Sequence, residues 1–367
     1  MFMNYVDYVL FHHQIPNLRS FKLTCNKFCA ANRVHSWVST VSHHKLRELH
    51  LHFFNQEPDV IPTSVYRCES LMMLKISSPR CAFNPPYSIS LPSLTTLDFH
   101  GLRFLDEDLT QQFFSSLPAL ETLIIKGCEF HNHQKLVISL PSLRVLNIYA
   151  ALFEPNELSS PIIKVCAPKL QFLSCETDSL PRQYILSNMP VLEVVMLNAE
   201  ECGKPVLTLE EVHRNARNLL EDLVNVKKLY IPACLVKSLP HEDFMRRNLP
   251  FLTNLTYLEV FRPCSGRDIL SVLQIMPNLE YLTFDKAYAS SEDELTPYIG
   301  EMLPQCFQSR IKEIQINEYD GSLEDFPMII FLLNNVPALK ITTVIDSIND
   351  YGDPVETIWL RRNSLNS

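Results

Sequence analysis

The segment LPSLTTLDF at residues 91–99 returns almost unchanged as LPALETLII at residues 117–125 and as LPSLRVLNI at residues 140–148. Three apolar residues define the pattern, for example Leu94, Leu97 and Phe99 in the first copy. The second of them follows the first by three positions, and the third follows the second by two. In an extended strand, residues two positions apart point to the same side. Each copy therefore predicts a short strand with one buried face.

Thirteen copies of this pattern lie between Leu18 and Val344, separated by 22 to 34 residues. This pattern and length are typical of leucine-rich repeats, in which one strand and a returning helix or turn form each repeat. The predicted fold is α/β: a leucine-rich-repeat solenoid, a curved horseshoe with a parallel concave sheet and helices or turns on the convex face. The first apolar residues of the copies are Leu18, Leu46, Leu71, Leu94, Leu120, Leu143, Leu170, Leu192, Val226, Leu255, Leu279, Ile311 and Leu339.

Helices are expected on the convex face. Thr208 with Glu211, and Ser291 with Glu294, have the spacing of a capping box ahead of an apolar stretch. Proline often stands just before a predicted strand, where it disfavours continuation of a returning helix. Further segments with apolar faces of helical length are residues 109–116, 269–275 and 326–333.

Composition narrows the class of protein. Of the 367 residues, 46% are hydrophobic. The number of cysteines, 11, is odd, and the sequence has no Cys-x-x-Cys motif. This favours reduced core or consensus cysteines, such as Cys128 and Cys234, over a secreted disulfide framework. No signal peptide or membrane-spanning stretch is recognisable, so we expect a soluble intracellular protein of the cytoplasm and/or nucleus. The formal net charge of −9 argues against nucleic acid as a general partner.

Charge is distributed unevenly along the chain. Residues 1–100 contain nine Lys or Arg against six Asp or Glu, whereas residues 285–356 contain four against fourteen, a balance of −10. Such a field could orient an incoming partner. The interpretation that we favour is an acidic end exposed to solvent, without a partner.

No enzyme signature is present, so we predict no catalytic residue and no cofactor site. The acidic run Asp106, Glu107 and Asp108 opens a predicted helix, where negative charge favours the helix dipole. We interpret it as structural.

Two His-x-His pairs are candidate metal ligands. His131 and His133 fall in a polar segment and are interpreted as exposed loop residues. His50 and His52 share one face of the second predicted strand, but no carboxylate or thiol is evident in that repeat to complete a site. We therefore predict no metal site and regard His50 and His52 as ordinary concave-surface residues.

A partner protein is expected on the concave face, where solenoids of this type usually bind. The readable surface positions begin polar, with Lys22, His50, Lys75 and Asp98, and become aromatic in the ninth to eleventh copies. Buried aromatic residues contribute much of the binding energy of protein interfaces, although strands favour Tyr and Phe in any case. The predicted partner-binding residues are Lys228, Tyr230, Tyr257, Glu259, Phe261, Tyr281 and Asp285.

The sequence also resembles plant F-box proteins with leucine-rich repeats. The resemblance rests on NYVDYVL (4–10), NKFC (26–29), NRVHSWV (32–38), RCESLMMLK (67–75) and DEDLTQQFF (106–114). Toward the C-terminus, CFQSRIKEIQI (306–316), YDG (319–321) and FLLNNVPAL (331–339) are similar to the FBD module of the same family. The expected organisation is a solenoid over residues 1–300 and FBD-like repeats, continuous with it, over residues 301–367.

In that family an N-terminal F-box docks on the adaptor of an SCF ubiquitin ligase, and the repeats hold the substrate. The F-box itself, with its Leu-Pro-x-Glu-type start and Trp-Arg motif, has no counterpart in this sequence. The resemblance therefore implies a non-enzymatic recognition module of such a receptor, with the adaptor as a partner only if a longer product supplies the F-box. The alternative is a stand-alone interaction protein, or a degenerate paralogue, without a role in ubiquitination.

Overall fold

The chain forms two compact units, and each is described by itself. The first contains residues 1–191 and 199–206, and the second residues 192–198 and 207–367. The expected boundary at residue 300 stays a prediction. The computed structural model describes residues 2–12, 18–25, 30–54, 61–79, 81–154, 161–179, 181–201, 208–239, 249–289, 292–299, 302–317, 326–336, 341–345 and 357–361.

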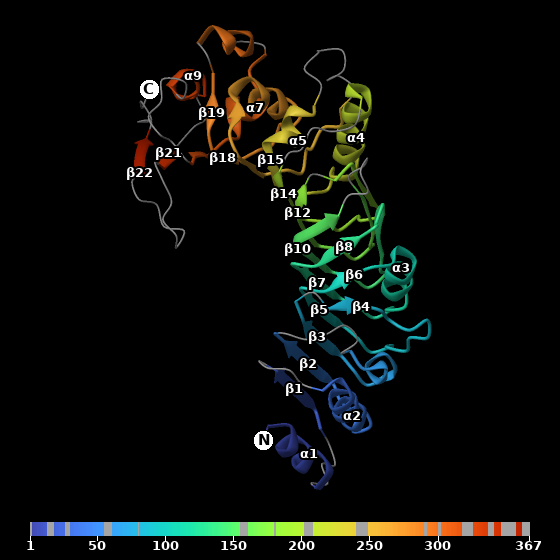
Figure 1. Cartoon of the computed structure of the whole chain (residues 1–367). Helices are drawn as coiled ribbons and strands as arrows, with labels where there is room; N and C mark the ends of the chain where they lie inside the picture. The colour runs from blue at the N-terminus through green and yellow to red at the C-terminus, as the bar shows by residue number, and fades with distance from the viewer. Residues whose placement is uncertain are drawn as a thin grey trace. The chain divides into compact units, whose positions relative to one another are not determined.

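In the first unit, seven strands pair in chain order, each parallel to the next (Figure 1). Their register aligns equivalent repeat positions, so Leu49, Leu74, Leu97, Leu123 and Leu146 form one row, and all of them are fully buried. This is the predicted leucine ladder. The strands are β1 (Ser20–Cys25), β2 (Glu48–Phe53), β3 (Met73–Ser77), β5 (Thr96–His100), β7 (Thr122–Lys126), β10 (Val145–Glu154) and β12 (Phe172–Ser179).

The returning segments of this unit form two further parallel ladders that the sequence analysis did not predict. One contains β4 (Ala82–Phe83), β6 (Arg103–Phe104) and β8 (Glu129–His131), and it continues into residues 152–154 of β10. The other contains β9 (Lys135–Ser139), β11 (Ile162–Cys166) and β13 (Gln183–Ser187). The unit also has α1 (Phe2–His12), α2 (Ala31–Ser42), η1 (Thr63–Arg67) and α3 (Glu107–Ser115).

A cluster of phenylalanines fills the space between the inner strands and the returning segments. The Phe104 ring stacks on Phe130 at a centroid distance of 4.7 Å, and Phe130 stacks on Phe153 at 4.9 Å. Phe83 contacts the Phe113 ring edge-on at 4.9 Å, so α3 is joined to the same core. We call Phe83, Phe99, Phe104, Phe113, Phe130 and Phe153 the phenylalanine cluster; all six are buried.

In the second unit, residues 194–198 of β14 (Val194–Glu201) begin a second series of parallel strands. The series continues through β15 (Lys228–Pro232), β16 (Tyr257–Phe261), β18 (Tyr281–Phe284), β20 (Glu313–Ile316) and β21 (Ile341–Ile345), and β22 (Thr357–Arg361) closes it antiparallel to β21. Together, the two units give every one of the thirteen copies a strand that begins two residues after its first apolar residue. The predicted leucine-rich-repeat fold is confirmed.

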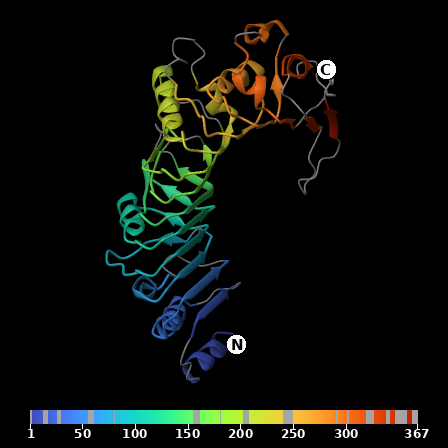
Figure 2. The same ribbon diagram turned by 180° about the vertical axis from the view of Figure 1, so that it is seen from behind.

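The returning segments of the second unit are mostly helical. Figure 2 shows α4, in yellow, and the later helices from behind. The helices are α4 (Leu209–Asp222), α5 (Ala233–Lys237), α7 (Gly266–Leu273), η2 (Glu292–Glu294), η3 (Thr296–Tyr298), α8 (Gln305–Ser309) and α9 (Phe326–Asn335), and a short ladder joins β17 (Cys264–Ser265) to β19 (Ala287–Tyr288).

The predicted helix signals are largely confirmed. Helices α3, α7 and α9 lie where apolar faces were expected. At α4 the capping box is complete, since the Thr208 hydroxyl accepts from the Glu211 amide and the Glu211 carboxylate accepts from the Thr208 amide. The other capping pair begins at Ser291, which lies outside the described residues. Asp106 caps α3 by accepting from the Leu109 amide at 2.9 Å, as the structural interpretation of the acidic run requires.

Two expectations need correction. His133 is buried rather than exposed, because its returning segment packs under α3; one ring nitrogen lies 2.8 Å from the His131 carbonyl and the other 3.1 Å from the Thr110 hydroxyl. Burial lowers its pKa. Cys234 is disulfide-bonded, not reduced. Eight other described cysteines form no disulfide, as predicted: Cys25, Cys68, Cys81, Cys128, Cys166, Cys175, Cys264 and Cys306.

Candidate partner-binding surface

The seven predicted partner-binding residues come from three neighbouring strands of the second unit. Alternation along β15, β16 and β18 directs Leu229, Leu258 and Leu282 into the core, and all three are fully buried. The residues between them lie on the opposite side of the sheet, which we call the inner face. Register places Lys228, Tyr257 and Tyr281 in one row, and Tyr230, Glu259 and Thr283 in the next. The sequence therefore predicted correctly which side chains share a face.

Aromatic rings on this face pack against one another while staying partly exposed. The Tyr230 ring lies 5.1 Å from the Tyr257 ring, at an interplanar angle of 37°. It also stacks on the Phe261 ring at 6.4 Å and 23°. Tyr230 thus bridges two rings of the neighbouring strand. We call Tyr230, Tyr257, Phe261 and the nearby carboxylates Glu259 and Asp285 the aromatic–acid patch.

Glu259 lies in the middle of this patch. It stands directly across from Tyr230, and Tyr257 and Phe261 are two residues before and after it on its own strand. Its carboxylate accepts a hydrogen bond from the Tyr257 hydroxyl, at 2.7 Å between the oxygens. Partial burial raises the pKa of Glu259, the Tyr257 hydrogen bond opposes that rise, and the negative charge of Asp285 adds to it. The protein thus holds a carboxylate where its charge is poorly solvated.

Asp285 follows β18 and borders the patch. Its carboxylate accepts from the backbone amide of Arg262 and from the side-chain amide of Asn317, the latter at 3.4 Å. Asn317 is itself held by Gln315, whose side-chain nitrogen donates to it at 2.8 Å. Asn317, Gln315 and Thr283 were not predicted from the sequence, although their places in the repeat register would have put them on this face.

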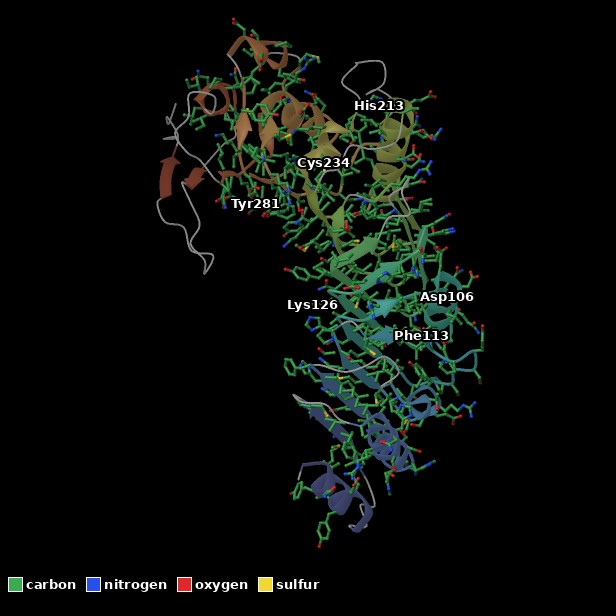
Figure 3. All side chains as sticks on the ribbon, viewed as in Figure 1. Asp106, Phe113, Lys126, His213, Cys234 and Tyr281 are labelled. Carbon is green, nitrogen blue, oxygen red and sulfur yellow. The ribbon has the colours of Figure 1, made fainter. Side chains whose placement is uncertain are left out.

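The remaining two predicted residues lie at the edge of the patch. Tyr281, labelled in Figure 3, is 38% exposed, and the Lys312 ammonium lies 5.6 Å above its ring. Lys312 also pairs with Glu280 at 2.6 Å, which raises the Lys312 pKa. Lys228 is exposed across from Tyr257. Its side chain makes no ion pair within the described part of the chain.

The inner face of the first unit has a different chemistry. Register aligns Lys22, His50, Lys75 and Asp98 in one row, and Lys75 pairs with Asp98 at 3.2 Å. Burial, together with the positive charges of Lys22 and Lys75, lowers the pKa of His50. A neutral imidazole could bind a metal, yet the described residues contain no group of three or more His, Cys, Asp or Glu arranged to hold one.

Thiol chemistry finds no support at the buried cysteines. Burial raises the pKa of Cys128 and of Cys175 to about 12. Because the thiolate is the reactive form of cysteine, these two side chains are inert core residues. Within the described residues, no helix is both long and apolar enough to cross a membrane.

Comparison with known proteins identifies relatives of this chain. Residues 34–198 match the family model described as "FBD-associated F-box protein At5g56370, LRR repeats". The chain is 26% identical to the Arabidopsis thaliana protein "FBD-associated F-box protein At5g60610" over 320 residues, which are 84% of this chain and 77% of the relative. It is 24% identical to "F-box/FBD/LRR-repeat protein At5g56420" of the same plant over 352 residues, 94% of this chain and 78% of the relative.

These matches extend well beyond the repeats covered by the family model. A third Arabidopsis thaliana relative, "FBD-associated F-box protein At5g38590", is 25% identical over 339 residues, which are 91% of this chain and 77% of that protein. Over most of its length the chain is therefore similar to plant F-box proteins with FBD and LRR-repeat modules.

Proposed function

We propose that this protein is a non-enzymatic recognition module that holds a partner protein on the inner face of its second unit. The observation that carries the proposal is the aromatic–acid patch, in which three packed rings and two carboxylates remain partly open to solvent. Aromatic side chains present large contact area and little conformational freedom, and they dominate the energy of protein interfaces. Strand propensity alone explains Tyr and Phe on a sheet, but it does not explain a half-buried carboxylate among them.

A double variant tests this assignment. Tyr230→Ala with Tyr257→Ala removes the centre of the ring packing, while the leucine ladder beneath stays intact. We expect proteins captured from a plant-cell extract by the wild type to decrease at least about tenfold with the double variant, since a lost hot spot costs about 2 kcal/mol or more. Quantitative mass spectrometry of the captured proteins measures this.

The matched control is Tyr149→Ala, which removes an exposed tyrosine from a strand of the first unit. It should leave the captured proteins unchanged. If the double variant and the wild type capture the same proteins in equal amounts, the patch is not the partner-binding surface.

We further propose that the chain serves as the substrate-recognition part of a receptor of an SCF ubiquitin ligase, with the F-box supplied by a longer native product. The printed names of its relatives combine F-box, FBD and LRR modules, and this supports the proposal. Such a receptor would work in the cytoplasm or the nucleus.

The intact mass of the endogenous protein tests the link to the ligase. A mass above 42.3 kDa by the size of an F-box, together with co-purification of the ligase adaptor, is the expected result. A mass of 42.3 kDa without adaptor would favour the second candidate, a stand-alone interaction protein that binds a target without ubiquitination. In either case, the capture experiment above tests whether the patch binds a partner protein.

A further inference from the structure

The two carboxylates of the aromatic–acid patch have no cationic partner within the described residues. Glu259 accepts one hydrogen bond, from the neutral Tyr257 hydroxyl. Asp285 accepts from a backbone amide and from the neutral side chain of Asn317. Ion pairs are formed nearby, for example between Lys312 and Glu280, but neither patch carboxylate takes part in them.

Aromatic rings surround one of these carboxylates. Glu259 has aromatic rings on three sides, because Tyr230 faces it across the strands and Tyr257 and Phe261 flank it along β16. A ring face carries partial negative charge and attracts a cation within about 6 Å of its centroid. Rings and carboxylates in the patch therefore favour the same kind of ligand, one with positive charge.

Two further observations point the same way. Burial raises the pKa of Glu259, and the nearby negative charge of Asp285 raises it further. An incoming cation relieves both unfavourable effects. In addition, residues 285–356 contain fourteen Asp or Glu against four Lys or Arg, so the sequence that follows the patch is strongly acidic. Charge complementarity of this kind steers a basic partner and selects against an acidic one.

We infer that the aromatic–acid patch binds an arginine side chain in a basic segment of the partner protein. A guanidinium group is planar, so it can stack on a ring face while its N–H groups donate to carboxylates beside it. The patch offers both groups: the partly exposed rings of Tyr230, Tyr257 and Phe261, and the oxygens of Glu259 and Asp285. The inference rests on the proposed function, because it assigns the partner chemistry of that same surface.

The test uses a fluorescein-labelled tetra-arginine amide as the probe and a tetra-citrulline amide as its neutral counterpart of nearly equal shape. Fluorescence anisotropy with the full chain measures both affinities. We expect the arginine peptide to bind at least about tenfold more tightly than the citrulline peptide, because hydrogen bonds to charged groups contribute more than neutral ones. Added salt should weaken the arginine complex. Equal affinity of the two peptides, or no binding of tetra-arginine, would overturn the inference.

Variants locate the binding. Glu259→Gln should reduce the affinity for tetra-arginine about tenfold, and Tyr230→Leu, which keeps an apolar side chain but removes the ring, about two- to fivefold. Glu48→Gln is the matched control: it makes the same change of charge on a strand of the first unit, where Glu48 pairs in register with Ser20 and Met73 rather than with aromatic rings. Equal loss with Glu48→Gln would show that only net charge matters, which contradicts the inference. Thermal melts of all three variants verify folding.

The positive charge of Lys228, a neighbour of the patch, allows an independent test of the inference. Lys228 stands beside the patch, across from Tyr257, so Lys228→Ala removes a positive charge that repels a cationic ligand. The variant should bind tetra-arginine at least as tightly as the wild type, and weaker binding would contradict the inference. Should tetra-arginine fail while the Tyr230→Ala, Tyr257→Ala variant still loses its captured proteins, the inference is wrong and the proposed function stands. If that variant loses nothing, the proposed function is wrong as well.

Discussion

In the described residues, each unit has a group of contacting aromatic side chains, and the two groups lie on opposite sides of the inner strands. In the first unit, six phenylalanines lie between the strands and the returning segments and are buried. In the second, Tyr230, Tyr257 and Phe261 contact one another on the inner face and stay partly exposed. The same repeat thus uses aromatic packing for stability in one unit and displays it in the other.

The returning segments also differ between the two units. In the first unit several of them form extra strands, and buried phenylalanines such as Phe104 and Phe130 lie on these strands. In the second unit helices such as α7 return the chain, and α7 buries aliphatic residues, among them Ile269 and Leu270. Tyr230 and Tyr257 lie on the inner face because they alternate along their strands with the buried Leu229 and Leu258.

Phe104→Ala should have the largest effect on stability. The Phe104 ring is fully buried, stacks on Phe130 and contacts Phe83 at 5.1 Å, so its removal leaves a cavity and breaks these and two further ring contacts. We expect a loss of about 3–5 kcal/mol in the free energy of unfolding. Urea denaturation, followed by circular dichroism, measures it. A loss below about 1 kcal/mol would show that the phenylalanine cluster does not stabilise the first unit.

Leu146→Ala should follow closely, with a loss of about 2–5 kcal/mol. Leu146 is fully buried in the leucine ladder, where it pairs in register with Leu123 and Leu173. The variant separates the contribution of the aliphatic ladder, which both units have, from that of the phenylalanine cluster. A nearly unchanged urea midpoint would mean that the ladder can close around the deleted side chain.

The repeat pattern predicted the inner strands of both units because it has a strict spacing and recurs thirteen times. It did not predict the strands of the returning segments, although KLVIS (135–139) and IIKVC (162–166) alternate buried with partly exposed residues in the structure. This alternation extends over only five residues in each segment, and helices or turns were expected on that side of the sheet. The burial of His133 was missed because its polar segment was interpreted as an exposed loop.

For the candidate surface, register predicted which residues share a face, but it could not predict their contacts. Whether Tyr230 packs on Tyr257, and whether Glu259 accepts from Tyr257, depends on side-chain rotamers that neighbouring strands select together. The supporting residues Gln315 and Asn317 belong to a later copy, and their role becomes visible only when β20 is placed beside β18.

Thr208→Ala should have a moderate effect, confined to the second unit. The Thr208 hydroxyl accepts from the Glu211 amide, and its loss leaves helix α4 without its N-cap. We expect a loss of about 1 kcal/mol. Hydrogen exchange of the α4 amides, compared with those of α3 as an internal control, measures the change. If α3, which belongs to the first unit, loses as much protection as α4, the effect of the lost cap is not confined to the second unit.

Tyr230→Ala should have the smallest effect on stability, although it removes a ring of similar size to Phe104. Because Tyr230 is partly exposed and lies outside the leucine core, part of its surface is already in contact with water in the free protein. We expect a loss of no more than about 1 kcal/mol, close to the range of surface substitutions with lost ring contacts. Urea denaturation alongside Phe104→Ala provides the direct comparison. A loss as large as that of Phe104→Ala would mean that the aromatic–acid patch is part of the folding core, and that its exposed rings are held there for stability rather than for a partner.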